Sequence, residues 1–192
     1  MHEVSETQDW RARKWEETHL RIYDTAIRLF QEHGFEQVNV GQIAAGAGVS
    51  VPTFYAHYSS KEHLVMQLPT ADDVAALLAT QPAELPVGER IRRAAPLYFA
   101  HWDMEFQLVR WRIIATTPSL RRRAAEFERA TAELVTDAIP AEPGTASVQS
   151  ATVLVNAYLA AFTLGVLAWA DGNGERKIEE LVDEAFDALE NR

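Results

Sequence analysis

One stretch of the chain constrains its fold more than any other: residues 34–62, GFEQVNVGQIAAGAGVSVPTFYAHYSSKE. Within it, small and apolar residues recur from Ile43 to His57 at the spacing of two short helices packed closely together. Ala44 is small where the second helix must approach the first, and Gly48 suits a turn that requires a positive φ. The spacing therefore predicts a helix-turn-helix hairpin.

Capping residues mark where both helices of this hairpin begin. Asn39, before Val40, is a favourable N-cap for the first helix, and Ser50 is one for the second. Pro52 then lies in the first turn of the second helix, where its missing N–H costs nothing.

The second helix has one face for the core and one for solvent. Phe54 and the ring of Tyr58 are expected to point inward. The outer face is the one that a DNA major groove would meet, and it carries Val51, Thr53, Tyr55 and His57. The alternative is an ordinary hairpin of an all-helical core, since such hairpins outnumber DNA readers.

The surrounding sequence favours the DNA-reading interpretation. A helical pattern precedes the hairpin at Leu20, Tyr23, Ala26, Ile27 and Phe30. The motifs A-x-x-L-F-x-x-x-G-F, I-A-x-x-A-G-V-S and T-F-Y-x-H-Y-x-S-K-E follow one another, and residues 18–66 closely resemble the N-terminal domain of TetR/AcrR transcriptional repressors. The resemblance implies an all-α chain, with an N-terminal arm over residues 1–17, a three-helix helix-turn-helix DNA-binding domain over 18–66, and a helical ligand-binding and dimerisation domain over 67–192.

The resemblance also implies DNA contacts. The residues that would face DNA are Val51, Pro52, Thr53, Tyr55 and His57, while Tyr58 and Lys61 would approach backbone phosphates. Asn39 and Val40, at the start of the preceding helix, would direct backbone N–H groups to another phosphate.

Two departures from the family pattern change how this chain is expected to recognise DNA. Many relatives carry basic residues near Gly41 and Val51, which this chain lacks. Residues 1–66 hold six Lys/Arg against nine Asp/Glu, within a chain of formal net charge −10. Non-specific DNA affinity should therefore be weak, and specific binding should depend on two copies acting together.

The N-terminal arm is expected to compensate for the basic residues that the hairpin lacks. Its basic residues stand among Trp10 and Trp15, and arms of this kind reach into an adjacent groove. The DNA contacts expected from it are Arg11, Arg13 and Lys14. The alternative is a frayed, solvated terminus.

The middle of the chain is the expected place for a small-molecule effector. Aromatic side chains are dense there, although packing in the core is their commoner use. The side chains expected to line a cavity for an apolar or amphipathic molecule are Phe99, Trp102, Phe106, Trp111, Phe127, Tyr158 and Phe162. Pro69 should end the helix that starts at Ser60, with Thr70 capping the next. In the family, effector binding moves the connecting helix and changes the distance between the two reading helices.

Residues 151–170 contain no charge and are long enough to span a bilayer, but their polar residues and missing basic flank favour a buried helix. An apolar stripe over residues 178–189 predicts an antiparallel partner for it. The family pairs its last two helices with their copies, which implies a homodimer through Leu154, Ala161, Gly165, Ala168, Leu181 and Phe186. Burial within one chain alone is the alternative.

No catalytic constellation, metal-ligand spacing or cofactor motif stands out, and the chain has no cysteine. We therefore expect no enzyme activity, metal or cofactor, and a cytoplasmic location, since the N-terminus carries no apolar signal sequence. The expected partners are a palindromic double-stranded DNA operator, an effector and a second copy of the chain, without a membrane. The alternative function is a ligand- or partner-binding helical module whose DNA-binding domain is vestigial.

Overall fold

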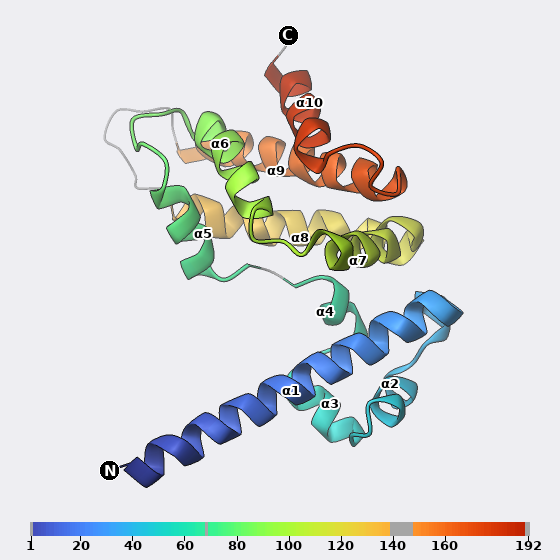
Figure 1. Ribbon diagram of the computed structural model, residues 1–192. Helices are drawn as coiled ribbons and strands as arrows, with labels where there is room; N and C mark the ends of the chain where they lie inside the picture. Colours follow the sequence, from blue (N-terminus) through green and yellow to red (C-terminus); the bar gives the residue numbers. More distant parts are fainter. Residues whose placement is uncertain (1, 68, 139–147, 191–192) are drawn as a thin grey trace. The chain divides into compact units, whose positions relative to one another are not determined.

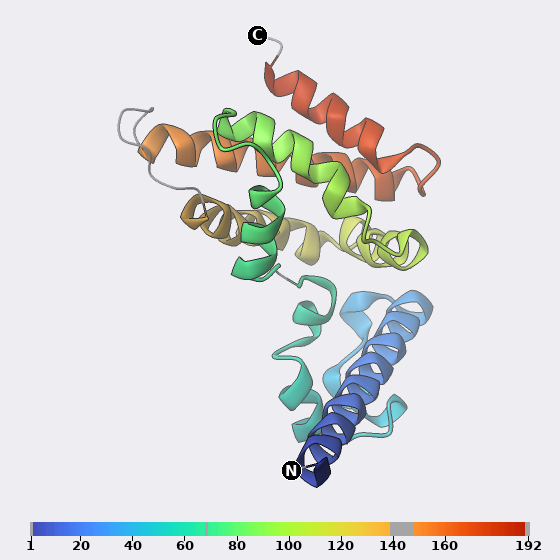
Figure 2. The same ribbon diagram turned by 60° about the vertical axis from the view of Figure 1, so that its left-hand side comes forward.

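The computed structural model describes residues 2–67, 69–138 and 148–190, and these residues form helices and no strand (Figures 1 and 2). The helices divide into two compact units, Met1–Val65 and Met66–Arg192. The all-α class predicted from the sequence is confirmed, with a helix-turn-helix hairpin in the first unit and a larger helical assembly in the second.

The first unit is built from α1 (His2–His33), the 3-10 turn η1 (Phe35–Gln37), α2 (Val40–Gly46), α3 (Val51–His57) and α4 (Lys61–Val65). Both expected N-caps of the hairpin are present. Asn39 and Gln42 form a capping box, and the Ser50 hydroxyl accepts the backbone N–H of Thr53 at 3.1 Å. Gly48 lies between α2 and α3 with φ of 65°, the left-handed conformation that this turn requires.

The first helix is longer than the sequence interpretation predicts. Residues 1–17 are expected as an arm ahead of the first helix, but α1 begins at His2 and runs unbroken to His33. No Pro or Gly interrupts this segment, and most of its residues are good helix formers. The core face also differs, because Leu20 is 53% exposed whereas Ile22 is completely buried.

The second unit contains α5 (Ala71–Ala79), α6 (Val87–Phe99), α7 (Met104–Thr116), α8 (Pro118–Asp137), α9 (Val148–Asp171) and α10 (Ile178–Glu190). Helix α9 contacts α6, α7, α8 and α10. It is long and apolar enough to cross a membrane by length and composition, with 39% of its apolar window buried within the protein. Its contacts with four neighbouring helices are those of a core helix.

The close crossing of α9 and α10 corrects part of the predicted dimer interface. A Cβ on Gly165 would lie 2.6 Å from the Cα of Val182, so this glycine permits contact between two helices of the same chain. Phe186 is buried with its ring centroid 5.4 Å from that of Tyr158, and Ala161 is buried as well. Gly165, Phe186 and Ala161 thus pack against residues of the same chain. Leu154 and Ala168 are exposed, and Leu181 is half-buried.

Candidate DNA-binding surface and effector cavity

Helix α3 presents a mixed apolar and hydroxyl face to solvent. Phe54 is completely buried, while Tyr55 is 54% exposed and Val51 is 41% exposed. Pro52 is also exposed, and the half-buried Thr53 places its hydroxyl 2.7 Å from that of Ser50. This face carries no Lys or Arg, so it can offer a DNA groove hydroxyl hydrogen bonds and apolar contacts but no guanidinium.

The polar groups of Asn39 at the start of α2 already have hydrogen-bond partners within the protein. The backbone N–H of Asn39 donates to the Gln42 side chain at 2.8 Å, and the Asn39 side chain accepts the Gln42 N–H at 3.0 Å. A phosphate at Asn39 would therefore have to displace Gln42, whereas the neighbouring residue Val40 is half-buried in the first turn.

Tyr58 is buried, whereas the sequence interpretation expects it beside a backbone phosphate. Its side chain is 1% exposed, and its hydroxyl donates to the backbone carbonyl of His19 at 3.1 Å. Burial raises the pKa of the Tyr58 hydroxyl well above its ordinary value. The residue anchors the end of α3 to α1.

The half-buried Lys61, the other residue expected at a phosphate, is bonded within the protein. Its ammonium group donates to the carbonyls of Phe35 and Val38 at 2.9 and 3.0 Å and lies 4.3 Å from the centre of the Phe35 ring. Lys61 thus ties α4 to the turn that leads into α2. Position in the motif did not reveal this role, because the two carbonyls lie more than twenty residues earlier in the chain.

His57 belongs to an aromatic stack that joins α1 to α3. The stack consists of Trp15, His19, His57 and Tyr58: Trp15 lies 4.7 Å from His19 and 4.8 Å from His57, and His19 lies 4.2 Å from Tyr58, measured between ring centroids. His57 is half-buried, so only part of it remains for DNA. The spacing of Trp15 and His19, one helical turn apart, was the available sequence signal for this stack.

The environment of the stack favours neutral imidazoles. Burial lowers the pKa of both His19 and His57, and the nearby His57 and His63 lower the pKa of His19 further. The Nδ1 atoms of His19 and His57 are buried and have no hydrogen-bond partner among the described residues.

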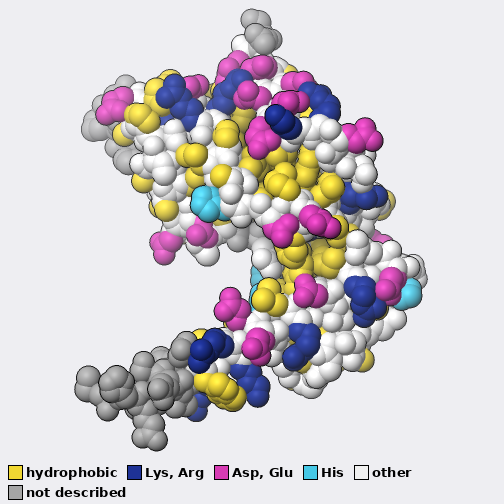
Figure 3. All heavy atoms as spheres, in the orientation of Figure 1, with side chains coloured by type: hydrophobic (Ala, Val, Ile, Leu, Met, Phe, Trp, Pro, Cys, Tyr) yellow, Lys and Arg dark blue, Asp and Glu magenta, His cyan; other side chains and the backbone are white. Residues whose placement is uncertain are grey.

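The N-terminal half of α1 carries the basic residues predicted for the arm. Residues 10–17 are all exposed, and the Lys14 ammonium lies 4.9 Å from the centre of the Trp10 ring. Figure 3 shows dark blue side chains gathered along this part of α1 beside an apolar one. Arg11, Arg13 and Lys14 therefore lie on a helix rather than on an extended arm.

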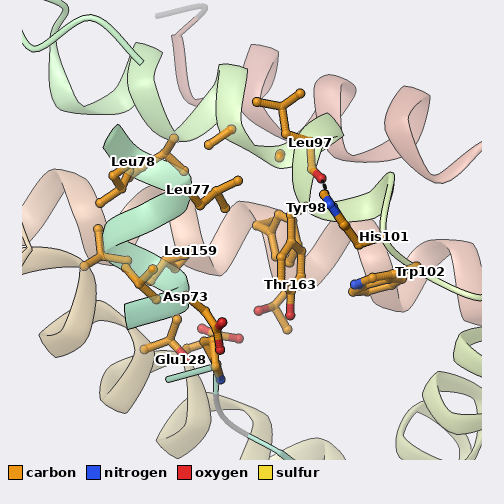
Figure 4. Close-up of a pocket in the computed structure, with 18 of the residues that line it drawn as sticks. Asp73, Leu77, Leu78, Leu97, Tyr98, His101, Trp102, Glu128, Leu159 and Thr163 are labelled. Carbon is orange, nitrogen blue, oxygen red and sulfur yellow. Dashed lines mark hydrogen bonds between the residues drawn. The ribbon is translucent and has the colours of Figure 1, made fainter. Parts of the chain in front are cut away.

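The second unit contains a cavity of about 800 Å³, partly open to solvent, which is lined from α5, α6, α7, α8 and α9 (Figure 4). Four of the seven aromatic residues predicted to line it do so: Trp102, Trp111, Phe127 and Phe162. The other three lie elsewhere: Phe99 packs behind Phe162, Tyr158 packs on Phe186 with its hydroxyl donating to Glu190, and Phe106 is exposed.

The cavity also has polar lining that the aromatic pattern does not predict. Asp73 comes from α5, Tyr98 from α6, Glu128 from α8 and Thr163 from α9. These residues occur at single positions in otherwise solvent-facing or apolar stretches, so only the tertiary structure brings them together. Among the described residues, no group of three or more His, Cys, Asp or Glu side chains has the arrangement of a metal site.

Comparison with known proteins agrees with the hairpin geometry. The family profile of bacterial regulatory proteins of the tetR family matches residues 22–68. Relatives include MftR of Mycobacterium tuberculosis, a candidate mycofactocin biosynthesis transcriptional regulator, with 35% identity over 109 residues, 52% of each chain. Another is the transcriptional repressor AcnR of Corynebacterium diphtheriae, with 32% identity over 108 residues, 56% of each chain. The chain thus spans about half the length of these curated relatives.

Solved structures show the same fold over most of the chain. NalD of Pseudomonas aeruginosa, the secondary repressor of a multidrug efflux pump, aligns with a TM-score of 0.54 and 20% identity over 90% of this chain and 96% of its own. FadR of Bacillus halodurans, a fatty acid degradation regulator, aligns with a TM-score of 0.53 and 19% identity, covering 90% and 94%. The hairpin, its motifs and these matches define a helix-turn-helix regulator. The chain belongs to the TetR/AcrR family.

The two lysines of the first unit should respond differently to mutation. Lys61→Met removes two hydrogen bonds from a charged donor and should lower the free energy of unfolding by about 1–3 kcal/mol, measured by denaturant titration. It should leave the salt dependence of DNA binding unchanged, because Lys61 contacts protein carbonyls. Lys14→Gln, on the exposed half of α1, should leave stability unchanged and reduce the salt slope by about one if it contacts a phosphate. A reduced salt slope in Lys61→Met would contradict the inward role.

Protonation of the aromatic stack should weaken the first unit at mildly acidic pH. Because the folded-state pKa of His19 is lowered, the unfolded chain binds more protons below the ordinary histidine pKa of about 6.5, so stability should fall as the pH drops below that value. Thermal unfolding of wild type and His19→Phe at pH 7.5 and 5.0 measures this, and the variant should lose less stability on acidification. His33→Asn, outside the stack, is the control. Equal losses in His19→Phe and wild type would count against the stack as the source.

Proposed function

We propose that this protein is a homodimeric DNA-binding transcriptional repressor, which leaves a palindromic operator when a small apolar or amphipathic molecule occupies the cavity of its second unit. The observation that carries this proposal is the outer face of α3, where Tyr55 and Val51 stand exposed on a helix whose other face is anchored to α1. A surface of this kind matches the reading helix of a helix-turn-helix domain.

The proposed reading chemistry relies on hydroxyl and apolar contacts. Tyr55 and Thr53 would donate hydrogen bonds to bases or phosphates, while Val51 and Pro52 would contact thymine methyl groups. Val40, Asn39 and the exposed edge of His57 remain candidates for secondary contacts. Tyr58 and Lys61 support this surface from inside the protein.

The N-terminal half of α1 would supply the missing positive charge. Arg11, Arg13 and Lys14 lie on the same helix that anchors α3, within one compact unit. Their attraction for phosphates would offset the scarcity of cations on α3 itself.

An exposed apolar face on α9 supports dimerisation. Val153, Leu154 and Leu164 are exposed there, at a spacing that places them along one side of the helix. Figure 3 shows apolar side chains gathered over the region of α9 and α10, bordered by charged ones. Pairing this face and the half-buried Leu181 with a second copy would bury it and set two α3 helices at the half-site spacing of about 34–36 Å.

The connector between the units would transmit effector binding. Helix α4 ends at Val65 and α5 begins at Ala71, where Thr70 and Asp73 form a capping box. A ligand against α5 would therefore act on the first helix after the DNA-binding unit. We place the protein in the cytoplasm with α9 as a core helix, and we assign it no enzyme activity, because regulators of this family bind DNA rather than catalyse reactions.

The DNA-binding proposal is tested by electrophoretic mobility shift with DNA flanking the protein's own gene. Tyr55→Ala should weaken binding about tenfold or more, because a contact of about 1 kcal/mol is lost in each half-site. Tyr58→Phe, which removes only the hydroxyl bond to His19, is the matched control and should change stability by about 1 kcal/mol with little change in DNA affinity. A vestigial domain would bind no DNA at any salt concentration, and unchanged binding by Tyr55→Ala would remove α3 as the reading face.

Dimerisation is tested on the outer face of α9. Leu164 is 62% exposed within one chain, so Leu164→Glu should fold normally but place a charge in the dimer seam. Sedimentation equilibrium should show a monomer, with a corresponding loss of operator affinity. Met104→Glu, at an exposed apolar position on α7, is the control and should remain dimeric. A dimeric Leu164→Glu protein would assign the interface to another surface.

A further inference from the structure

The cavity of the second unit combines apolar walls with two carboxyl groups, one on the exposed Asp73 and one on the half-buried Glu128. Asp73 and Glu128 line it from different helices, and both are labelled in the lower part of the cavity in Figure 4. Among the described residues, neither forms an ion pair with a Lys, Arg or His side chain, whereas several other carboxylates of this unit do. Arg110 also lines the cavity, and its guanidinium is hydrogen-bonded to Gln107 at 3.0 Å.

The two carboxyl groups differ in their surroundings. Both the hydroxyl and the backbone N–H of Thr70 donate to Asp73, at 2.7 and 3.1 Å, and these bonds lower the pKa of Asp73. The neighbouring Thr163 hydroxyl favours the charged form of Glu128, but burial has the larger effect and raises the pKa of Glu128. The carboxylate of Glu128 is thus an anion that its surroundings leave partly uncompensated.

The walls around these groups suit the body of an amphipathic ligand. Tyr98, Trp102, Trp111 and Phe162 contribute aromatic side chains, whose faces attract cations as well as apolar groups. Trp111 is only 7% exposed, so its ring is a well-buried part of this wall.

We propose that the cavity binds an organic ammonium ion, an amine on an apolar body, with Glu128 as its main counter-charge and Asp73 as a second. The proposal rests on the regulatory function proposed above, and it names the chemical class of the effector. An ammonium group supplies the missing positive charge, while the aromatic side chains accept the apolar body. A cation at Asp73 also competes with Thr70 for the same carboxylate, and so acts on the capping box that begins α5.

The ligand class is tested by isothermal titration calorimetry of the full-length protein with three probes that share one chain: decylamine, 1-decanol and decanoate. Decylamine should bind at least tenfold more tightly than the other two at neutral pH. Glu128→Gln keeps a side chain that can bond to Thr163, and it should weaken decylamine binding about tenfold while changing decanol binding less than twofold. Glu126→Gln, at an exposed position on the same helix, is the matched control and should bind decylamine like wild type.

Three results would overturn the proposal: equal or tighter binding of decanol or decanoate, equal effects of Glu128→Gln on all three probes, or no measurable binding of decylamine. Asp73→Asn is a second test variant, and it should also weaken the binding of decylamine more than the binding of the other two probes. A parallel mobility-shift assay separates this inference from the repressor function. Operator binding without amine binding would reject the ligand class alone, whereas amine binding without operator binding would reject the repressor function alone.

Discussion

The contact between Tyr58 and α1 is the interaction on which the DNA-binding unit depends. The Tyr58 ring is buried at the end of α3, and the Tyr58 hydroxyl donates a hydrogen bond to the carbonyl of His19. A seven-residue helix has too few internal hydrogen bonds to be stable by itself, so α3 owes its position to anchors of this kind. Phe54, completely buried at the centre of α3, is a second anchor, and the orientation of Tyr55 follows from both.

The same anchoring leaves less of two positions in the family motif available to DNA. The Lys61 ammonium group donates hydrogen bonds to two backbone carbonyls, and the His57 ring stacks on Trp15. Both interactions strengthen the scaffold that holds α3 and leave fewer groups for phosphates. The exposed cations of this unit instead include Lys14 on the N-terminal half of α1, where helical structure replaces the expected arm.

Helix α9 contributes to the core of the second unit, to the cavity wall and to the proposed dimer surface. Its buried side chains, such as Val155 and Val166, form the core, while Phe162 and Thr163 face the cavity. Its exposed apolar residues form the proposed dimer surface. Gly165 permits the close approach of α10 to one side of α9, while the adjacent Leu164 remains 62% exposed. The long uncharged sequence is thus consistent with the contacts that α9 makes with four neighbouring helices.

The sequence by itself determined the helix-turn-helix hairpin, since Gly48, the caps at Asn39 and Ser50 and the inward Phe54 are local signals whose effects act within a few residues. It also identified four aromatic residues of the cavity, including Trp102 and Phe162, because their density reflects a large apolar interior. Only the tertiary structure decided that Lys61 turns to carbonyls more than twenty residues away, that Gly165 serves an intrachain crossing, and that Asp73 and Glu128 share one cavity. Such pairings join distant segments, and their free energy depends on burial and on partners that local spacing does not specify.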